Sequence, residues 1–180
     1  MKFLVRWRVR LGYPVAIAVF WFARPEPRWI LAGSLVGVIG VGLRAWAAGY
    51  LRKQEELAVG GPYAYTRNPL YLGSAVLLVG LGLAAHSWIS AALAVAYFAV
   101  FYTAVMRREE QEMRQKFGDV YESYARVVPL FFPRWSPYRG PGGTGSFSWR
   151  QFMKNREYRA MAGFLFVLGV LVIAWAYQLG

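Results

Sequence analysis

The sequence predicts an all-α membrane protein, a single domain over residues 1–180 that crosses the bilayer about five times. Three observations lead to this fold class. Hydrophobic residues make up 57% of the chain and charged residues only 17%, which is too apolar for a soluble domain of this length. Apolar stretches of roughly 20 residues, the length that spans a bilayer as a helix, recur along the chain. Basic residues gather in alternate connecting segments, as they do in polytopic membrane proteins.

The first predicted span covers residues 3–23, where a basic start leads into an apolar stretch. The same pattern describes a signal peptide, but Trp21, Phe22 and Arg24 stand where a cleavage site would need small residues. We therefore predict that this segment is retained as a membrane helix.

The other four spans follow from hydropathy. They are predicted at residues 29–50, 70–85, 88–106 and 161–178. Only His86 and Ser87 separate the third span from the fourth, so these two spans should form a tight helical hairpin. The longer connections, residues 51–69 and 107–160, carry the motifs that bear on function.

The distribution of basic residues predicts which parts face the cytoplasm. The N-terminus, residues 51–69 and residues 107–160 together hold 18 of the 21 lysines and arginines. The other connections hold only Arg24 and Arg28, and Arg44 lies within the second span. By the positive-inside rule, the N-terminus and both motif segments are cytoplasmic and the C-terminus lies outside. The expected location is the cell inner membrane or its equivalent.

Charge and cysteine content narrow the range of partners. Membrane topology and attraction to anionic headgroups account for the net charge of +12, so membrane lipids rather than nucleic acid are the expected partners. The chain has no cysteine, which excludes disulfides and thiolate metal sites, and it has only one histidine, His86. We therefore expect no metal centre.

The segment after the fourth span has three parts. The spacing of apolar residues over 107–124 predicts an amphipathic helix that continues the fourth span and packs on the membrane domain. Its apolar face should carry Met113, Phe117, Val120, Tyr121 and Tyr124. From Pro129 onward, prolines and the glycine-rich run 140–146 predict a linker rather than a packed element. Aromatic and basic residues mix over residues 147–159, as in segments at a membrane surface.

The first functional motif runs from Gly60 to Gly73, at the cytoplasmic entrance to the third span. Its glycines and prolines favour an irregular backbone with exposed amide groups. Its three tyrosines and Arg67 supply π faces, hydroxyls and a charge, which suit a cationic or nucleoside-containing ligand. An aromatic belt at the membrane surface, with a proline at the start of a helix, is an equal alternative.

The second motif begins with Arg107, Arg108, Glu109 and Glu110 and runs to Pro129. Adjacent acids at the cytoplasmic end of a spanning helix can hold ribose hydroxyls, and adjacent arginines can hold a carboxylate through forked hydrogen bonds. A solvated charge run that closes a helix is the alternative, and it is the commoner situation for such a cluster taken alone.

Together the two motifs resemble those of isoprenylcysteine carboxyl methyltransferases and phospholipid methyltransferases, a group of membrane enzymes. That group pairs GPYxxxRHPxYxG with EExxLxxxFGxxYxxYxxxVP. This chain has GPYAYTRNPLYLG and EEQEMRQKFGDVYESYARVVP in the same order, with a two-span hairpin between them. Asn68 replaces the usual histidine and Met113 the usual leucine. Asn68 keeps the ability to hydrogen-bond but has no titratable group, so it cannot perform a role that needs an imidazole proton.

The resemblance implies a cytoplasmic site for S-adenosylmethionine and a lipophilic methyl acceptor that enters from the membrane. The implied catalytic residues are Arg67, Asn68, Glu109 and Glu110. The implied cofactor-binding residues are Tyr63, Tyr65, Asn68, Pro69, Tyr71, Gly73, Arg108 and Glu110. The two motifs should therefore meet in space, with Tyr65 or Asn68 near Glu110. Glu122 is expected to face solvent.

The acceptor itself stays open between a prenylated cysteine carboxylate, a phospholipid amine, and a small hydrophobic acid or thiol. Candidates for binding it are Arg44, Tyr121 and Tyr124. Snorkelling of Arg44 toward the cytoplasm is an equal alternative for that residue. Without a second histidine as general base, the chain favours an acceptor that is already nucleophilic, or one deprotonated by Glu109, Glu110 or water.

Two other classes of function are compatible with the sequence. One is a sterol-type membrane reductase that uses NADPH, because some such reductases carry a similar RHPxYxG segment. The other is a non-catalytic membrane scaffold packed through Gly33, Gly37 and Gly40. Binding of S-adenosylmethionine or of NADPH distinguishes the three. The sequence does not determine the oligomeric state.

Overall fold

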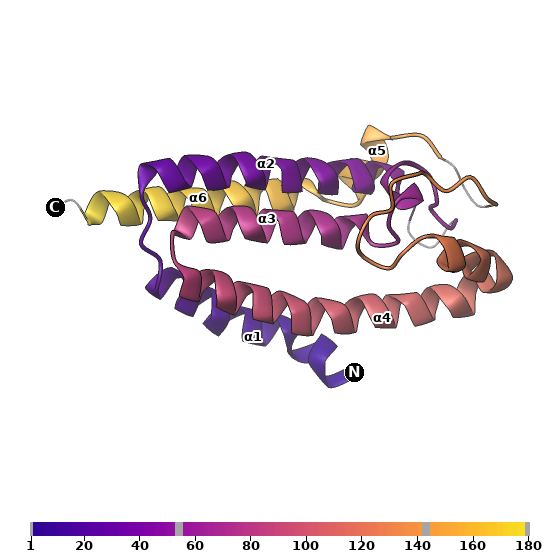
Figure 1. Cartoon of the computed structure of the whole chain (residues 1–180), viewed down its shortest axis with the longest axis horizontal. Helices are drawn as coiled ribbons and strands as arrows, with labels where there is room; N and C mark the ends of the chain where they lie inside the picture. Colours follow the sequence, from indigo (N-terminus) through magenta and orange to yellow (C-terminus); the bar gives the residue numbers. More distant parts are fainter. Residues whose placement is uncertain (1, 53–55, 142–144, 179–180) are drawn as a thin grey trace. The chain divides into compact units, whose positions relative to one another are not determined.

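A computed structural model describes residues 2–52, 56–141 and 145–178 of the chain, and all regular secondary structure in these ranges is helical. The elements are α1 (Lys2–Trp21), α2 (Pro27–Tyr50), the short 3-10 helix η1 (Gly61–Ala64), α3 (Pro69–Ala85), α4 (Trp88–Val127), α5 (Trp149–Lys154) and α6 (Tyr158–Tyr177) (Figure 1). The predicted all-α fold class is confirmed, and each predicted span coincides with one helix or part of one.

Three of the helices, α2, α4 and α6, are long and apolar enough to cross a membrane. Two shorter apolar helices, residues 10–21 within α1 and the whole of α3, accompany them. The predicted spans therefore comprise three long apolar helices and two shorter ones. In α4 the apolar part ends before Arg107, so the charged part of the helix lies beyond the predicted span.

The chain divides into two compact units, and α2, α3 and α4 each contribute to both. The first unit consists of residues 1–40, 75–105 and 160–180. The second consists of residues 41–74 and 106–159. Both functional motifs lie in the second unit.

Small residues bring the helices of the first unit close together. In this unit α2, α3 and α6 run side by side (Figure 1). A Cβ atom on Gly33 would lie 2.3 Å from the carbonyl oxygen of Gly80, and one on Gly37 would lie 2.4 Å from the ring of Phe164. These helices can approach this closely only because glycine leaves the space, as is common for helices packed in a membrane.

The predicted hairpin between the third and fourth spans is present. His86 adopts φ 46°, a left-handed conformation that reverses the chain between α3 and α4. At the same end of this unit, the amide of Arg24 donates to the carbonyl of Ala85 at 2.8 Å. The hydroxyl of Ser90 in α4 donates to the carbonyl of Val19 in α1 at 2.7 Å, which places α1 beside the start of α4.

The second part of α4 supplies the core of the second unit, but it is not one regular helix. Gly118 has φ 49° and ψ −127°, a conformation that favours glycine, and it breaks the helix there. Beyond the break, two tyrosines of the predicted apolar face are buried in a cluster with the 57–59 segment. The cluster comprises Leu57, Val59, Tyr121, Tyr124 and Val128, with Met113, Phe117, Ala125 and Tyr138 at its edge.

One expectation about this face needs correction. Val120 is 41% exposed, so its predicted place among the packed residues is wrong, because the break at Gly118 changes the register of the side chains that follow. The expected packing of this face on the membrane domain stays a prediction, and the structure shows that the face packs on the loop at Leu57 and Val59.

The prediction of a linker from Pro129 onward is wrong for residues 129–138. This segment is hydrogen-bonded to the first motif at several points. The amide of Arg67 donates to the carbonyl of Pro129 at 3.0 Å, and the amide of Arg134 donates to the carbonyl of Tyr65 at 3.0 Å. Proline lacks a donor but keeps its carbonyl, so a proline-rich segment can still accept bonds from a neighbouring loop. Part of the predicted glycine-rich linker, residues 142–144, lies outside the described residues.

The short helix α5 is attached to the C-terminal end of α2. The side-chain amide of Asn155 donates to the carbonyls of Ala48 and Leu51, both at 2.9 Å, and so satisfies carbonyl groups at the end of α2. Ser148 caps the first turn of α5 by accepting from the amide of Gln151. These contacts fix α5 beside the last turn of α2 within the second unit.

Candidate functional site

The first motif folds into a 3-10 turn followed by the start of α3. Pro69 is the first residue of α3, as its fixed φ favours. The carbonyl of Asn68 accepts the first helical hydrogen bonds, from the amides of Tyr71 at 3.1 Å and Leu72 at 3.0 Å. Asn68 is thus the N-terminal cap position, and this explains why the chain changes direction there.

The side chain of Asn68 has a structural partner. Its amide nitrogen donates to the carbonyl of Leu130 at 3.0 Å. The buried hydroxyl of Thr66, two residues earlier, donates to the carbonyl of Phe131 at 2.8 Å. These bonds hold the 129–138 segment against the motif, and the catalytic role implied for Asn68 stays a prediction.

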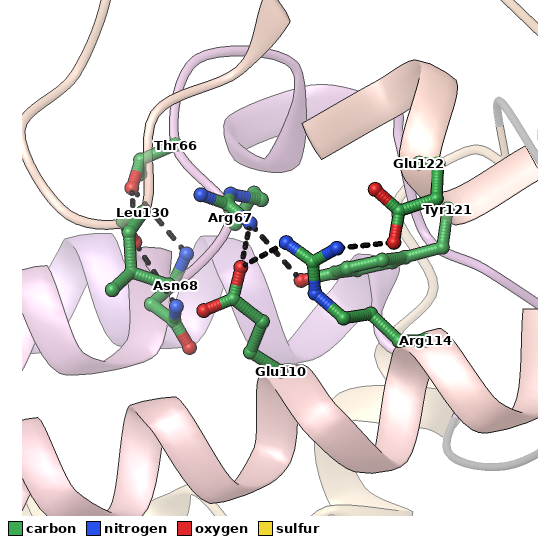
Figure 2. A network of polar contacts seen from close by, with 8 residues as sticks. All are labelled: Thr66, Arg67, Asn68, Glu110, Arg114, Tyr121, Glu122 and Leu130. Atoms are coloured by element: carbon green, nitrogen blue, oxygen red, sulfur yellow. Dashed lines mark hydrogen bonds and ion pairs between the residues drawn. The ribbon is translucent and has the colours of Figure 1, made fainter. Parts of the chain in front are cut away.

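The two motifs meet through Arg67 and Glu110. The guanidinium Nη1 of Arg67 donates to Oε1 of Glu110 at 2.5 Å and to the hydroxyl of Tyr121 at 3.3 Å (Figure 2). Arg114, one turn further along α4, also donates to Oε1 of Glu110 at 3.1 Å. Asn68 directly follows the arginine that makes the contact. The expected meeting of the motifs is confirmed, whereas their cofactor role stays a prediction.

Two further contacts join the motifs. The hydroxyl of Tyr71, in the first turn of α3, donates to Oε1 of Glu109 at 2.8 Å. The hydroxyl of the buried Tyr124 donates to the carbonyl of Tyr63 at 2.7 Å. Three contacts therefore fix the first motif on α4. Two involve the adjacent glutamates, Glu109 and Glu110, and the third involves Tyr124, which lies beyond the break at Gly118.

The charges around Glu110 keep it ionised. Partial burial alone would raise the pKa of its carboxyl group. The hydrogen bonds and positive charges of Arg114 and Arg67 outweigh this effect and hold the pKa of Glu110 below its usual range. Glu110 is therefore a carboxylate near neutral pH and a weaker base than an ordinary glutamate.

The tyrosines of the site are buried and keep their protons. Burial, reinforced by Tyr124, Glu109 and Glu157, raises the pKa of Tyr63 far above its usual range. Burial likewise raises the pKa of Tyr124 and, against the opposing effect of Arg67, that of Tyr121. At neutral pH these hydroxyls are hydrogen-bond donors rather than proton acceptors.

Arg44 lies in a network that the sequence analysis missed. Its Nε and Nη2 atoms bind both carboxylate oxygens of Glu157 at 2.8–3.0 Å, and the pair is largely buried. Its Nη1 atom donates to the carbonyl of Leu70 at 3.2 Å and to the hydroxyl of Ser74. An acceptor can bind Arg44 only by displacing one of these partners.

Some predicted site residues lie apart from these contacts. Arg108 is exposed and pairs with Glu112 one turn along α4 at 2.9 Å. Tyr65 contributes its backbone carbonyl to the 129–138 segment. Pro69 and Gly73 are buried in the first turns of α3. The cofactor-binding roles of these four residues stay predictions.

Glu122 does not face solvent as an isolated acid. It forms an ion pair with Arg114, which also binds Glu110 (Figure 2). Glu122 therefore belongs to the same network as Glu110. The side chain of Glu122 is 37% exposed, so it does face solvent, but its ion pair with Arg114 links it to Glu110 and makes it unsuitable as an independent control.

Two residues emerge from the structure that the motifs did not indicate. Glu157 is the only acid after Glu122 in the sequence, and an isolated acid beside a membrane span was a usable signal for a partner of Arg44. Arg134 reaches the first motif through its amide, and its Nη1 atom is buried with no hydrogen-bond partner in the described residues. No sequence pattern that we considered distinguished Arg134 from the other arginines of the proline-rich segment.

Comparison with known proteins places the motifs in a wider context. The sequence model of the phospholipid methyltransferase family matches residues 30–120, which include the first motif and the two glutamates. The chain is 33% identical to the cobalt-zinc-cadmium resistance protein CzcN of Cupriavidus metallidurans over 96% of this chain and 80% of that protein. It is also 33% identical to the nickel-cobalt-cadmium resistance protein NccN of Alcaligenes xylosoxydans xylosoxydans, over 96% of this chain and 81% of that protein.

A more distant relative covers the motif region. The protein-S-isoprenylcysteine O-methyltransferase of Schizosaccharomyces pombe is 31% identical over 45% of this chain and 34% of that enzyme. No solved structure shows significant similarity to the chain.

Proposed function

The chain belongs to the phospholipid methyltransferase family, and from this premise we propose that it transfers a methyl group from S-adenosylmethionine to a lipophilic acceptor at the membrane. The observation that carries the proposal is the meeting of the two motifs. Tyr71 binds Glu109 and Arg67 binds Glu110, so aromatic faces, a cation and two carboxylates gather in one place. This combination suits a ligand that carries an adenosine, a carboxylate and a sulfonium.

The atoms available at this place support the fit. The Nε atom of Arg67 is buried and has no acceptor among the described residues, so it can donate to a carboxylate. The recorded hydrogen bonds of Glu110 use Oε1, which leaves Oε2 to accept from a ribose hydroxyl. The ring of Tyr71 offers a π face for a cation. When bound, S-adenosylmethionine supplies an electrophilic methyl group on a positively charged sulfur.

The protein's own part in such a reaction is alignment and exclusion of water. Arg67 and Glu110 hold each other in place between the two motifs, and Tyr71 orients Glu109. Methyl transfer by in-line displacement needs donor and acceptor held at the correct distance and direction, and it needs no covalent nucleophile from the protein. The contacts between the motifs supply a rigid frame of this kind.

We propose an acceptor that is already nucleophilic near neutral pH, such as a carboxylate or thiolate on a lipophilic carrier. An ammonium must first lose a proton to a base. The lowered pKa of Glu110 makes it a poor base, and the raised pKa values of Tyr63 and Tyr124 keep their hydroxyls protonated. These residues are therefore poorly suited to deprotonating an amine, which favours an acceptor that needs no base.

Ligand binding to the purified full-length protein in detergent tests the proposal. The parent protein should bind S-adenosylmethionine and not NADPH. Glu109→Gln removes a charged acceptor whose hydrogen bonds are worth roughly 1.5 to 3 kcal/mol, so affinity should fall by about one to two orders of magnitude. Asp119→Asn is the matched control, because Asp119 is an exposed acid on the same helix.

The other outcomes favour the alternative functions. Binding of NADPH in place of S-adenosylmethionine would support a reductase, and binding of neither would support a scaffold. Transfer of a labelled methyl group to a prenylated thiol or carboxylate, compared with phosphatidylethanolamine, tests the class of acceptor. Transfer to the amine alone contradicts the proposed acceptor but leaves the proposed reaction standing.

We also propose that this methyl transfer supports resistance to divalent metals, because the relatives matched over nearly the whole chain are named as metal resistance proteins. The sequence has no cysteine and one histidine, so modification of a membrane component fits it better than direct ligation of metal. Metal-sensitive cells that express the parent chain should tolerate cadmium or cobalt salts better than cells that express Glu109→Gln. Equal protection by both proteins would separate resistance from methyl transfer.

A further inference from the structure

The segment from Phe147 to Arg159 presents cations and apolar groups on the same exposed surface. Trp149 is 70% exposed and Met153 is 56% exposed, one helical turn apart on α5. Arg150 and Lys154, which directly follow Trp149 and Met153 in the sequence, are exposed as well. Phe152 points inward and is buried, so α5 is amphipathic despite its short length.

The negative charge of this segment is directed away from the surface. Glu157 is its only acid, and both of its carboxylate oxygens bind Arg44. Arg150, Arg156 and Arg159 are exposed and form no ion pair with any residue that the structure describes. The burial of Glu157 therefore leaves residues 147–159 with an excess of exposed positive charge.

The position of this surface along the chain places it at a membrane boundary. Asn155 and Ser148 attach α5 to the last turn of α2, a helix long and apolar enough to cross a membrane (Figure 1). Four residues after α5 ends, the chain enters α6, which has the same property. An amphipathic segment with exposed tryptophan and arginine between two such helix ends is typical of contact with lipid headgroups.

We propose that the surface formed by Trp149, Arg150, Met153, Lys154, Arg156 and Arg159 binds the headgroups of anionic lipids. The arginines contact lipid phosphates, and Trp149 and Met153 insert at the level of the acyl-chain boundary. This interaction fixes the 147–157 segment, and with it Glu157 against Arg44, at the membrane surface. The inference does not depend on the proposed methyl transfer.

The experiment uses the purified full-length protein in a non-ionic detergent. Phosphatidylglycerol or the zwitterionic phosphatidylcholine is titrated in, and the melting temperature is followed to obtain an apparent lipid affinity. Phosphatidylglycerol should stabilise the protein and phosphatidylcholine should not. Arg150→Gln/Arg156→Gln should weaken the phosphatidylglycerol effect about thirtyfold, since each basic residue near an anionic surface contributes roughly 1 kcal/mol.

Two control variants make the result specific. Arg126→Gln/Arg139→Gln removes the same charge from other exposed positions and should leave the lipid response intact. Arg150→Lys/Arg156→Lys keeps the charge and should retain most of the response. Equal stabilisation by both lipids, an equal loss in the Arg126/Arg139 variant, or reproduction of the effect by inorganic phosphate would each overturn the proposal.

Discussion

Glu110 accepts charged hydrogen bonds from two arginines that belong to different elements, Arg67 in the first motif and Arg114 in α4. The sequence alone suggested a carboxylate held ready for a ribose. The structure shows that the same carboxylate also holds the motifs together. A substitution at this position should therefore affect folding as well as ligand affinity.

We expect Glu110→Gln to lower the free energy of unfolding by roughly 1.5 to 3 kcal/mol at neutral pH, the value of hydrogen bonds to charged groups. The folded-state pKa of Glu110 is lowered, so its contribution is present above the ordinary glutamate pKa and is lost as the pH falls through the folded value. The difference between parent and variant should shrink below about pH 4.

Melting temperatures in detergent at pH 7 and in the acid range measure this difference, with Asp119→Asn as the control. A gap between parent and Glu110→Gln that stays constant as the pH falls would show that ionisation of Glu110 is not what joins the motifs.

At the scale of elements, the break in α4 decides which residues of the second motif face the first. Gly118 has a positive φ, and a Cβ there would meet nothing within 4 Å, so any cost of a side chain comes from backbone strain rather than from a clash. The break lets Tyr121 and Tyr124 reach the 57–59 segment and Arg67 reach Tyr121.

Gly118→Ala should destabilise the protein by roughly 1 to 3 kcal/mol, the usual range for a residue held in a disfavoured backbone conformation. Gly163→Ala in α6 is the matched control, because a Cβ there also meets nothing and no positive φ is involved. The control should be neutral or slightly stabilising, since alanine favours helix. Melting temperatures of the two variants measure the difference in stability. A Gly118→Ala variant as stable as the control would mean that the fold does not require the positive φ at this position.

The ion pair of Arg44 and Glu157 attaches the chain before α6 to α2 and to the first turns of α3. Removing one partner leaves an unpaired buried charge, which lowers the free energy of unfolding by about 3 to 5 kcal/mol. Replacing both partners by apolar residues of similar size should cost much less.

Glu157→Leu is therefore expected to be less stable than the double variant Arg44→Met/Glu157→Leu. Denaturation of the parent, both single variants and the double variant gives the coupling between the two side chains. Additive losses would show that the pair does not act as a unit, and Arg44 would then again be available as an acceptor-binding residue.

At the scale of the whole molecule, the charge distribution predicts the orientation of an integral membrane protein. The cytoplasmic side should hold the N-terminus and both motifs, because 18 of the 21 basic residues lie in those segments. The C-terminus should lie outside. A reporter that is active only in the cytoplasm should be silent when fused after the last residue and active when fused before the first. Activity at the C-terminal fusion would require an even number of spans.

The sequence predicted helices and motifs more reliably than contacts. Each predicted span coincides with a helix because hydropathy is a local property, read from consecutive residues. The failures occurred where partners are far apart in the chain. Proline content predicts a linker over residues 129–138, but these residues pair with a neighbouring loop that is distant in the sequence. The apolar pattern places Val120 on the packed face, but the break at Gly118 changes the register of the side chains that follow.

The sequence by itself determined the all-α membrane class, the positions of the spans and the two motifs that define the family. Only the tertiary structure decided that Glu157 neutralises Arg44 across 113 positions of sequence, that Asn68 binds Leu130 across 62, and that Glu110 joins two arginines. The physical reason is the same in each case. A helix follows from the free energy of burying local apolar surface in a membrane, whereas the partner of a buried polar group depends on which distant segment the folded backbone brings within hydrogen-bonding distance.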